Sequence, residues 1–310
     1  MKFAFVFPGQ GSQAVGMMQG FAESTEVREV FSEASDALGQ DVWKLVERGP
    51  AEELNSTVNT QPVMLTAGYA VYRAWRAAGG PEPGMVAGHS LGEYTALVAS
   101  GVIAFRDAVP LVRFRAQAMQ EAVPIGEGAM AAILGLDDET VRAACREAAQ
   151  GQVVEPVNFN APGQVVIAGH KAAVERGVEA VKAKGAKRAI MLPVSAPFHS
   201  ALLKPAADRL AQYLAGIDCA APRVPVLNNV DVTVETDARR IRDALARQAC
   251  NPVRWVEVIG GLFASGITHV IECGPGKVLA GFTRRIETKL SGSAIGDPHS
   301  LSQALQALRP

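Results

Sequence analysis

The chain has 310 residues, of which 48% are hydrophobic and 20% are charged, a composition typical of a globular protein with one large domain or two unequal ones. Its formal net charge of -1 excludes a global field that would recruit nucleic acid or a membrane, so we expect neither as a partner; a local basic patch for an acidic partner is compatible with this total. The 4 cysteines are scattered and contain no C-x-x-C pair, which argues against a disulfide framework and against a zinc or other metal site.

The first predicted element is a strand from Phe3 to Phe7, because a continuous apolar run is typical of a strand buried on both faces of a parallel sheet. The loop PGQGSQ, residues 8–13, follows it directly. The apolar residues between Lys2 and Pro8 are too few for the core of a signal peptide or for a membrane span. We therefore expect a cytoplasmic protein.

A helix is predicted from Gln61 to Ala78, where apolar residues recur at helical spacing until Gly79-Gly80 ends the pattern. A short strand from Met85 to Ala87 follows, and the next helix is predicted from Glu93 to Ser100. The order strand, helix, strand, helix favours a parallel sheet with its site at the carboxyl ends of the strands.

The segment GHSLG, residues 88–92, lies between that second strand and helix and is the most informative motif in the chain. In a G-x-S-x-G pentapeptide the serine occupies a sharp turn, which presents Ser90 as a nucleophile. The first backbone N–H groups of the following helix can stabilise an oxyanion. A tight turn without a catalytic role is the alternative, and the strand-turn-helix context favours the nucleophile.

The next predicted helix, from Phe105 to Ala122, carries an arginine inside an apolar stripe. The stripe consists of Leu111, Val112, Ala118, Met119 and Ala122. Arg115 falls in its middle, whereas Arg113 does not. A guanidinium on an apolar face needs an anionic partner or a path to water. The alternatives are a structural ion pair, a snorkelling side chain, or bidentate capture of a substrate carboxylate.

The pattern changes between about residues 127 and 196, where it predicts the order strand, helix, strand, strand, helix, strand. The predicted elements are Ala129–Leu136, Asp138–Ala149, Val153–Phe159, Gln164–Ala168, Lys171–Lys184 and Arg188–Val194. The βαββαβ order is typical of a ferredoxin-like module. We interpret it as a subdomain, residues 127–196, inserted into a larger α/β unit formed by residues 1–126 and 197–310.

The larger α/β pattern resumes after this insertion. The predicted elements are the helix Leu202–Leu214, the strand Pro225–Asn228, the helices Ala238–Gln248 and Val256–Ala264, the strand His269–Glu272 and the helix Val278–Ile286. The tail after Leu290 has too weak a pattern for any element to be predicted.

A serine nucleophile needs a base, and the chain contains 5 histidines. We favour His199, because it lies where the inserted module rejoins the larger unit, and clefts between domains are common binding sites. A loop histidine without a role is the alternative. His89 adjoins Ser90, and neighbouring side chains on a tight turn generally point apart, so we interpret it as structural. The positions of His170, His269 and His299 offer no comparable argument.

Seven segments in order along the chain resemble those of the malonyl-CoA:acyl carrier protein transacylase family of bacterial fatty acid synthesis. They are FVFPGQGSQ at the N-terminus, GHSLGEY around Ser90, VRFRAQAMQ around Arg115, NFNAPGQVVIAG from Asn158, PFHSALLKPA around His199, RQACNPVRW from Arg247 and ECGPGKVL from Glu272. They follow one another from Phe5 to Leu279, so the match extends over almost the whole chain.

The resemblance implies a role for each matching residue. Ser90 would be the acylated nucleophile, His199 its base, and Arg115 the ligand of the malonyl carboxylate. The backbone N–H groups of Gln10 and Leu91 would form the oxyanion hole. The remaining implied positions are Gln248, whose backbone carbonyl would orient the histidine in place of an acidic triad member, and the substrate-binding residues Phe198, Met119 and Asn160.

The resemblance also implies an α/β-hydrolase-like core interrupted by the inserted module, and a ping-pong reaction through a serine ester. The substrates would be malonyl-CoA and holo acyl carrier protein, with no metal or redox cofactor and a monomeric enzyme. Three other interpretations stay open: a polyketide acyltransferase, a serine esterase or thioesterase, and a non-catalytic carrier-docking module. A hydrolase has no evident use for Arg115 and usually supplies a triad acid.

Overall fold

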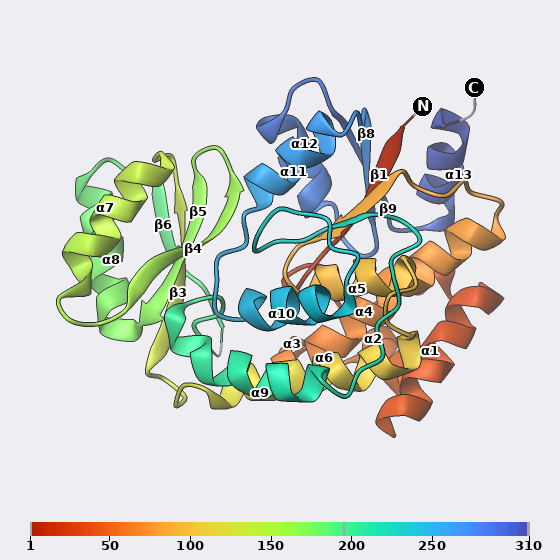
Figure 1. Cartoon of the computed structure of the whole chain (residues 1–310), viewed down its shortest axis with the longest axis horizontal. Helices are drawn as coiled ribbons and strands as arrows, with labels where there is room; N and C mark the ends of the chain where they lie inside the picture. The colour runs from red at the N-terminus through yellow and green to blue at the C-terminus, as the bar shows by residue number, and fades with distance from the viewer. Residues whose placement is uncertain (1, 195, 309–310) are drawn as a thin grey trace.

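Two separate β-sheets organise the chain (Figure 1). The computed structural model describes residues 2–194 and 196–308. One sheet has the strand order β7-β2-β1-β8-β9, and all its pairings are parallel. The other has the order β4-β5-β3-β6, and all its pairings are antiparallel. The chain is therefore a mixed α/β protein with a parallel sheet, as the sequence predicts.

The strands are β1 (Phe3–Phe7), β2 (Met85–Gly88), β3 (Gly128–Leu134), β4 (Val154–Ala161), β5 (Gln164–His170), β6 (Arg188–Met191), β7 (Val226–Leu227), β8 (His269–Cys273) and β9 (Ser291–Ile295). The α-helices are α1 (Thr25–Leu38), α2 (Val42–Arg48), α3 (Ala51–Asn55), α4 (Thr57–Ala77), α5 (Leu91–Ala99), α6 (Phe105–Glu121), α7 (Asp138–Ala149), α8 (Lys171–Ala183), α9 (Lys204–Leu214), α10 (Ala238–Gln248), α11 (Trp255–Ala264), α12 (Val278–Ile286) and α13 (Pro298–Ala307).

Strand β1 shows why the parallel sheet is buried on both faces. Its phenylalanines Phe3, Phe5 and Phe7 join the core formed with α1, α4 and α6, whereas Ala4 and Val6 join the core formed with α11 and α12. Successive side chains of a strand point to opposite faces, so an unbroken apolar run supplies both cores.

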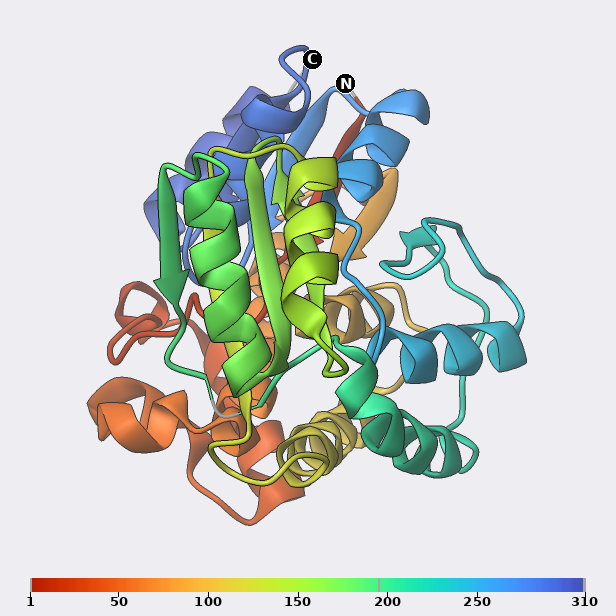
Figure 2. The same ribbon diagram turned by 90° about the vertical axis from the view of Figure 1, so that its left-hand side faces the viewer.

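The antiparallel sheet has α7 and α8 against one face, which Figure 2 shows from that side. Ala131 and Ile133 of β3 face these helices, whereas Met130 between them joins the core of the larger unit. The element order β3-α7-β4-β5-α8-β6 is the predicted succession. Strand β6 ends at Met191 instead of the predicted Val194, because the chain then leaves the sheet toward the larger unit.

Several elements lie where the sequence predicts none. Helices α1, α2 and α3 occupy the stretch before α4, and β9 and α13 occupy the tail after Leu290. Strand β7 has only the residues Val226 and Leu227 of the predicted four, since Asn228 turns away and accepts two backbone hydrogen bonds from its own loop. Met1, Ser195, Arg309 and Pro310, at or beside predicted domain boundaries, lie outside the described residues.

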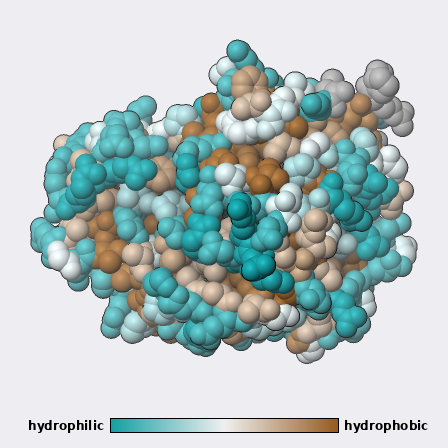
Figure 3. Space-filling view, viewed as in Figure 1, coloured by the Kyte–Doolittle hydropathy of each residue, from teal (hydrophilic) through white to brown (hydrophobic). Residues whose placement is uncertain are grey.

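The surface carries scattered apolar side chains among hydrophilic ones (Figure 3). The large exposed hydrophobic residues are Val15, Ile125, Ile190, Met191, Val234 and Val278. Such scattered exposure is ordinary for a folded protein. No helix in the described ranges 2–194 and 196–308 is both long and apolar enough to cross a bilayer.

Candidate active site

Ser90 lies on a strained turn between β2 and α5. Its backbone has φ 50 and ψ -108, which is left-handed and rare for a residue other than glycine. A Cβ on Gly88 would lie 1.9 Å from the backbone carbon of Gly92, and a Cβ on Gly92 would lie 2.0 Å from the carbonyl oxygen of Phe7. Both positions therefore require glycine, and the turn holds Ser90 at the carboxyl edge of the parallel sheet.

Ser90 and His199 form a hydrogen-bonded pair. Ser90 Oγ lies 2.7 Å from His199 Nε2, and His199 Nδ1 lies 2.8 Å from the backbone carbonyl oxygen of Gln248. A carbonyl oxygen only accepts, so Nδ1 carries the proton in a neutral ring and Nε2 accepts from the serine hydroxyl. Burial, followed by the charge of Arg115, lowers the pKa of His199 to about 3. The ring is thus a neutral acceptor of a proton near pH 7.

Arg115 of α6 points its guanidinium at the same serine. Its Nη2 donates to Ser90 Oγ at 3.1 Å and to Gln248 Oε1 at 2.9 Å, and its Nη1 donates to Gln61 Oε1 at 2.7 Å. The ring of Tyr94 lies 5.3 Å from the guanidinium carbon. The side chain is 2% exposed, and its Nε has no hydrogen-bond partner. Within the described residues, no carboxylate forms an ion pair with Arg115.

This arrangement leaves a buried positive charge with neutral partners beside a nucleophile. A structural ion pair, one alternative for Arg115, is therefore not found, and burial excludes a snorkelling side chain. A buried cation whose direct hydrogen-bond partners are all neutral is unfavourable. The site is consequently suited to a ligand that brings its own anionic group close to Ser90.

A cavity of ≈ 130 Å³ opens onto the Ser90 hydroxyl. It is lined by Gln10, Gln61, His89, Ser90, Leu91, Arg115, Met119, Met130, Asn158, Leu192, Val194, Phe198 and His199. Most predicted site residues are in this set. The antiparallel sheet and the segment after it contribute Met130, Asn158, Leu192 and Val194, so the cavity lies between the two sheets' regions.

Two predicted residues do not line the cavity. Gln248 lies behind it, in contact with both His199 and Arg115. Asn160 lies behind His89, whose Nε2 is 2.8 Å from the Asn160 side-chain oxygen. Asn158, two residues earlier on β4, lines the cavity instead, and its buried side-chain oxygen has no partner. His89 also packs against the ring of Trp255, with 5.4 Å between ring centroids.

Gln10 and Leu91, the residues expected to form the oxyanion hole, both line the cavity. In the described part of the chain, no hydrogen bond outside the helices and strands uses the backbone N–H group of either residue. Leu91 is the first residue of α5, where an N–H group has no partner within the helix. Neither N–H group thus has a hydrogen-bond partner among the contacts of the described residues, as an oxyanion hole requires.

Sequence reasoning missed three residues that organise this site. Gln61 binds Arg115; Asn229 accepts from the Ser90 backbone N–H at 2.8 Å; Glu93 is 2% exposed and accepts from the backbone N–H of Asn229 at 2.8 Å. For Glu93 a signal was present, because a charged residue stands in the otherwise apolar helix α5. Like Arg115 in its apolar stripe, a carboxylate at this position needs hydrogen-bond partners when it is buried.

A serine on a strand-to-helix turn, paired with histidine at the carboxyl edge of a parallel sheet, defines an enzyme of the acyl-transfer class. The profile of the family described as "Acyl transferase domain" matches residues 4–290. The chain belongs to this family.

Named relatives and solved structures agree with this assignment. The chain is 60% identical to the malonyl CoA-acyl carrier protein transacylase of Escherichia coli (strain K12), over 98% of this chain and 99% of that protein. It is 45% identical to the protein of the same name from Bacillus subtilis (strain 168), over 99% and 98%. An acyl-carrier-protein S-malonyltransferase structure from Burkholderia pseudomallei 1710b has a TM-score of 0.98 and 67% identity, covering 99% of this chain and 100% of that one.

A second solved structure contains a partner. It is a malonyl-transacylase in complex with a type II PKS acyl-carrier protein in its holo form, with a TM-score of 0.98 and 55% identity, covering 99% of this chain and 100% of that one.

Proposed function

We propose that this chain transfers the malonyl group from malonyl-CoA to the phosphopantetheine thiol of holo acyl carrier protein, and so supplies malonyl groups for fatty acid chain elongation. The observation that carries the proposal is Arg115, a buried cation that no carboxylate of the described residues contacts directly, beside the Ser90–His199 pair. Malonyl-CoA carries a free carboxylate a few bonds from its thioester, so it brings the missing charge to the required place. The names of the relatives support the same substrates.

The reaction has two half-reactions through one serine ester. Ser90 Oγ attacks the thioester carbonyl carbon while His199 Nε2 takes the hydroxyl proton, and the N–H groups of Gln10 and Leu91 receive the oxyanion. The carbon–sulfur bond breaks, and the histidine proton passes to the departing CoA thiolate. In the second half-reaction the carrier thiol gives its proton to His199 and attacks the ester, and Ser90 leaves with that proton.

Without substrate, Arg115 Nη2 donates a hydrogen bond to Ser90 Oγ at 3.1 Å, and the substrate carboxylate would replace this serine oxygen as the acceptor. On acylation the malonyl carboxylate takes over the guanidinium, which Gln61 and Gln248 continue to hold. Met119 and Phe198 form the apolar wall around the acyl chain. Asn160 contributes through His89, whose ring it holds at the cavity wall.

The proposal includes the architecture. The order β4-β5-β3-β6 with two helices on one face supports a ferredoxin-like subdomain at residues 127–196, and the parallel sheet with its serine turn supports an α/β-hydrolase-like core from residues 1–126 and 197–310. No metal or redox cofactor enters the chemistry, because the thioester is already an activated acyl group. We propose a cytoplasmic monomer that binds no nucleic acid and no membrane.

A polyketide pathway is the second candidate for the carrier protein. The complex of a 55% identical malonyl-transacylase with a type II PKS acyl-carrier protein favours it. The acyl-transfer chemistry is the same in both cases, and transfer rates to the two kinds of carrier protein distinguish them. A serine esterase or thioesterase would instead release malonate to water faster than it transfers the malonyl group.

The test is intact-protein mass spectrometry. After brief incubation with malonyl-CoA the protein should gain the mass of one malonyl group, and holo acyl carrier protein should remove it. Ser90→Ala should gain nothing, because the nucleophile is absent. A malonyl adduct on the Ser90→Ala variant would place the nucleophile elsewhere and overturn the proposal.

A further inference from the structure

Glu93 is a buried carboxylate that no step of the proposed reaction uses. It lies three residues after Ser90 on α5 and is 2% exposed. Its Oε2 accepts two hydrogen bonds, from the backbone N–H of Asn229 at 2.8 Å and from Nε2 of Gln248 at 2.9 Å. Burying a carboxylate among apolar side chains is unfavourable and is tolerated when such hydrogen bonds compensate. Asn229 and Gln248 therefore compensate the burial of this carboxylate.

Gln248 connects Glu93 to both Arg115 and His199. Its side-chain Nε2 donates to Glu93 and to the Ser90 carbonyl oxygen at 3.1 Å, and its Oε1 accepts from Arg115 at 2.9 Å. Its backbone oxygen accepts from His199 Nδ1 at 2.8 Å. A carboxylate can only accept and a guanidinium can only donate, so an amide between them has one orientation that satisfies both. Glu93 and the Ser90 carbonyl oxygen on one side, and Arg115 on the other, together fix which way the Gln248 amide faces.

Asn229 connects Glu93 to the backbone of the serine turn. Its side-chain oxygen accepts from the Ser90 N–H at 2.8 Å, and its side-chain nitrogen donates to the Gly88 carbonyl oxygen at 2.8 Å. Ser90 has a strained backbone, which persists only where its surroundings determine it. Glu93 therefore helps to hold Asn229, and the side chain of Asn229 in turn holds the backbone of the Ser90 turn.

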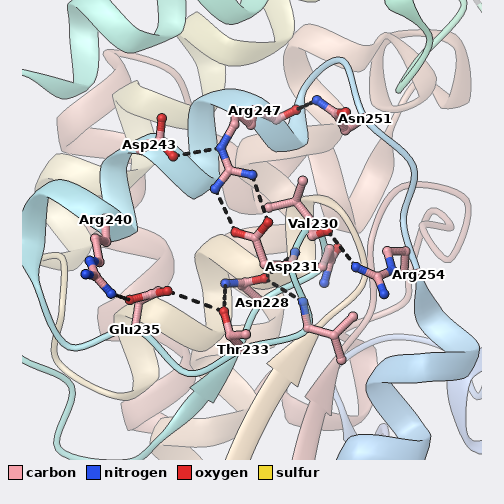
Figure 4. A network of polar contacts seen from close by, with 12 residues as sticks. Asn228, Val230, Asp231, Thr233, Glu235, Arg240, Asp243, Arg247, Asn251 and Arg254 are labelled. Carbon is pink, nitrogen blue, oxygen red and sulfur yellow. Dashed lines mark hydrogen bonds and ion pairs between the residues drawn. The ribbon is translucent and has the colours of Figure 1, made fainter.

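A second tie between the same two segments lies nearer the surface (Figure 4). Arg247, next to Gln248, makes a bidentate ion pair with Asp231, two residues after Asn229, at 2.9 and 2.7 Å. This outer tie is partly exposed and contacts neither Ser90 nor His199. It joins the same two segments, whereas the contacts of Glu93 reach Asn229 and Gln248, which touch the groups around the serine.

We propose that Glu93 is a positioning residue of this enzyme: its buried carboxylate oxygen holds the Gln248 amide toward Arg115 and holds Asn229 against the serine turn. The inference rests on the proposed function. It assigns the effect to hydrogen-bond acceptance at one oxygen and not to negative charge, because both contacts use the same atom, Oε2.

The test compares two replacements of similar size. Glu93→Gln keeps a carbonyl oxygen at the position of Oε2 and loses the charge, whereas Glu93→Met fills the space and has no acceptor. We expect single-turnover acylation of Ser90 by malonyl-CoA to fall at least about tenfold in the methionine variant, because a misplacement of catalytic groups by about 1 Å can cost about 10²-fold. The glutamine variant should stay within about threefold of wild type.

A second buried glutamate supplies the matched control. Glu272 of β8 is 0% exposed and accepts from the backbone N–H of Ala280, away from the cavity. Glu272→Gln should leave acylation within about threefold. Should Glu93→Met not fold by circular dichroism, Glu93→Leu replaces it, because it also lacks an acceptor for the two donors, and acylation should fall by the same factor.

A double-mutant cycle tests whether the effect passes through Gln248. Glu93→Met lowers the acylation rate by one factor in wild type and by another in a Gln248→Met protein. We expect the second factor to be at least about threefold smaller than the first. A folded Glu93→Met protein with unchanged acylation, a glutamine variant as slow as the methionine variant, or full multiplication of the two effects would each overturn the inference.

A neutral organophosphorus serine probe separates this inference from the proposed function. Labelling of Ser90 by the probe depends on His199 and on the serine turn but not on malonyl recognition, and it should slow in Glu93→Met as acylation does. Wild type labelled by the probe but not by malonyl-CoA would contradict the proposed substrate alone. Equal probe labelling of wild type and Glu93→Met would contradict the role of Glu93 alone.

Discussion

Two strand-to-helix junctions of the parallel sheet each contain a buried glutamate, and the two carboxylates find their partners at different distances along the chain. At the β2–α5 junction, Glu93 accepts from Asn229 and Gln248, which are 136 and 155 residues away in sequence. At the β8–α12 junction, Glu272 accepts from Ala280, in the first turn of the following helix. Burial raises the pKa of both carboxyl groups to about 7.

Both carboxyl groups are buried, so burial alone does not determine whether such a group affects activity or stability. Its hydrogen-bond partners do. At the first junction the carboxylate joins three distant segments around a nucleophile, whereas at the second it satisfies N–H groups at a helix start. We therefore expect substitutions around the first junction to change activity and those around the second to change stability.

The largest effect on the first junction is expected from His199→Ala. Loss of the base next to Ser90 should slow acylation by malonyl-CoA about 10² to 10⁴-fold in single-turnover kinetics. His170→Ala and His269→Ala are the controls, because neither side chain lines the cavity. Equal losses in all three variants would remove the distinction between His199 and an ordinary histidine.

Arg115→Ala should change the choice of acyl group. The malonyl carboxylate then lacks its partner, so kcat/KM for malonyl-CoA should fall by about 10²-fold or more, whereas that for acetyl-CoA should hold or rise since no buried cation faces the neutral acyl chain. Arg115→Lys keeps the positive charge but loses the planar guanidinium, so its kcat/KM for malonyl-CoA should lie between the values of wild type and Arg115→Ala.

Circular dichroism must show that both arginine variants are folded. A folded alanine variant in which malonyl-CoA and acetyl-CoA lose the same factor would make Arg115 a structural residue of the first junction, without a part in acyl selection.

At the β8–α12 junction, Glu272→Gln should change the pH dependence of stability. The folded-state pKa of about 7 exceeds the ordinary value of 4.5, so the folded protein binds more protons than the unfolded chain between these values. Stability associated with Glu272 is therefore present below about pH 4.5 and lost as the pH rises through about 7. The free energy of unfolding of wild type, relative to Glu272→Gln, should fall by about 2 to 3 kcal/mol from pH 4.5 to 8 in urea titrations. A pH-independent difference would contradict the shifted pKa.

The smallest expected effect is on the pH profile of acetyl transfer. Burial and the charge of Arg115 lower the pKa of His199 to about 3, so wild type should keep its base neutral well below pH 6. Removing the guanidinium in Arg115→Ala should raise that pKa and move the acidic limb of kcat/KM for acetyl-CoA to higher pH. An unmoved limb would show that Arg115 exerts no electrostatic influence on the histidine.

Sequence patterns that span only a few residues predict several elements of the fold correctly. Strand β1, the serine turn and helix α6 with Arg115 were all predicted, because apolar periodicity and the G-x-S-x-G spacing act within a few residues. Helices α10 and α12 have the predicted bounds, Ala238–Gln248 and Val278–Ile286.

What sequence reasoning missed depends on contacts between distant segments. Strand β9 has the sequence SGSAI, which has little β-propensity of its own and forms by parallel pairing with β8. The contacts of Asn229 with Ser90 and Gly88 join residues 139 and 141 apart, and nothing near Asn229 in the sequence signals them. The roles that the resemblance assigns to individual site residues stay predictions until the variants above are measured.

The glycines of the serine turn set which chemistries this scaffold can acquire. A Cβ at Gly88 or Gly92 would collide with main-chain atoms of Gly92 and Phe7, so these positions admit no alternative without moving the sheet itself. Ser90 and Arg115 instead direct their reactive side-chain atoms into a cavity. In a mutational library built on this chain, new nucleophiles and new acyl preferences are therefore accessible by single substitutions, while the turn that presents them tolerates none.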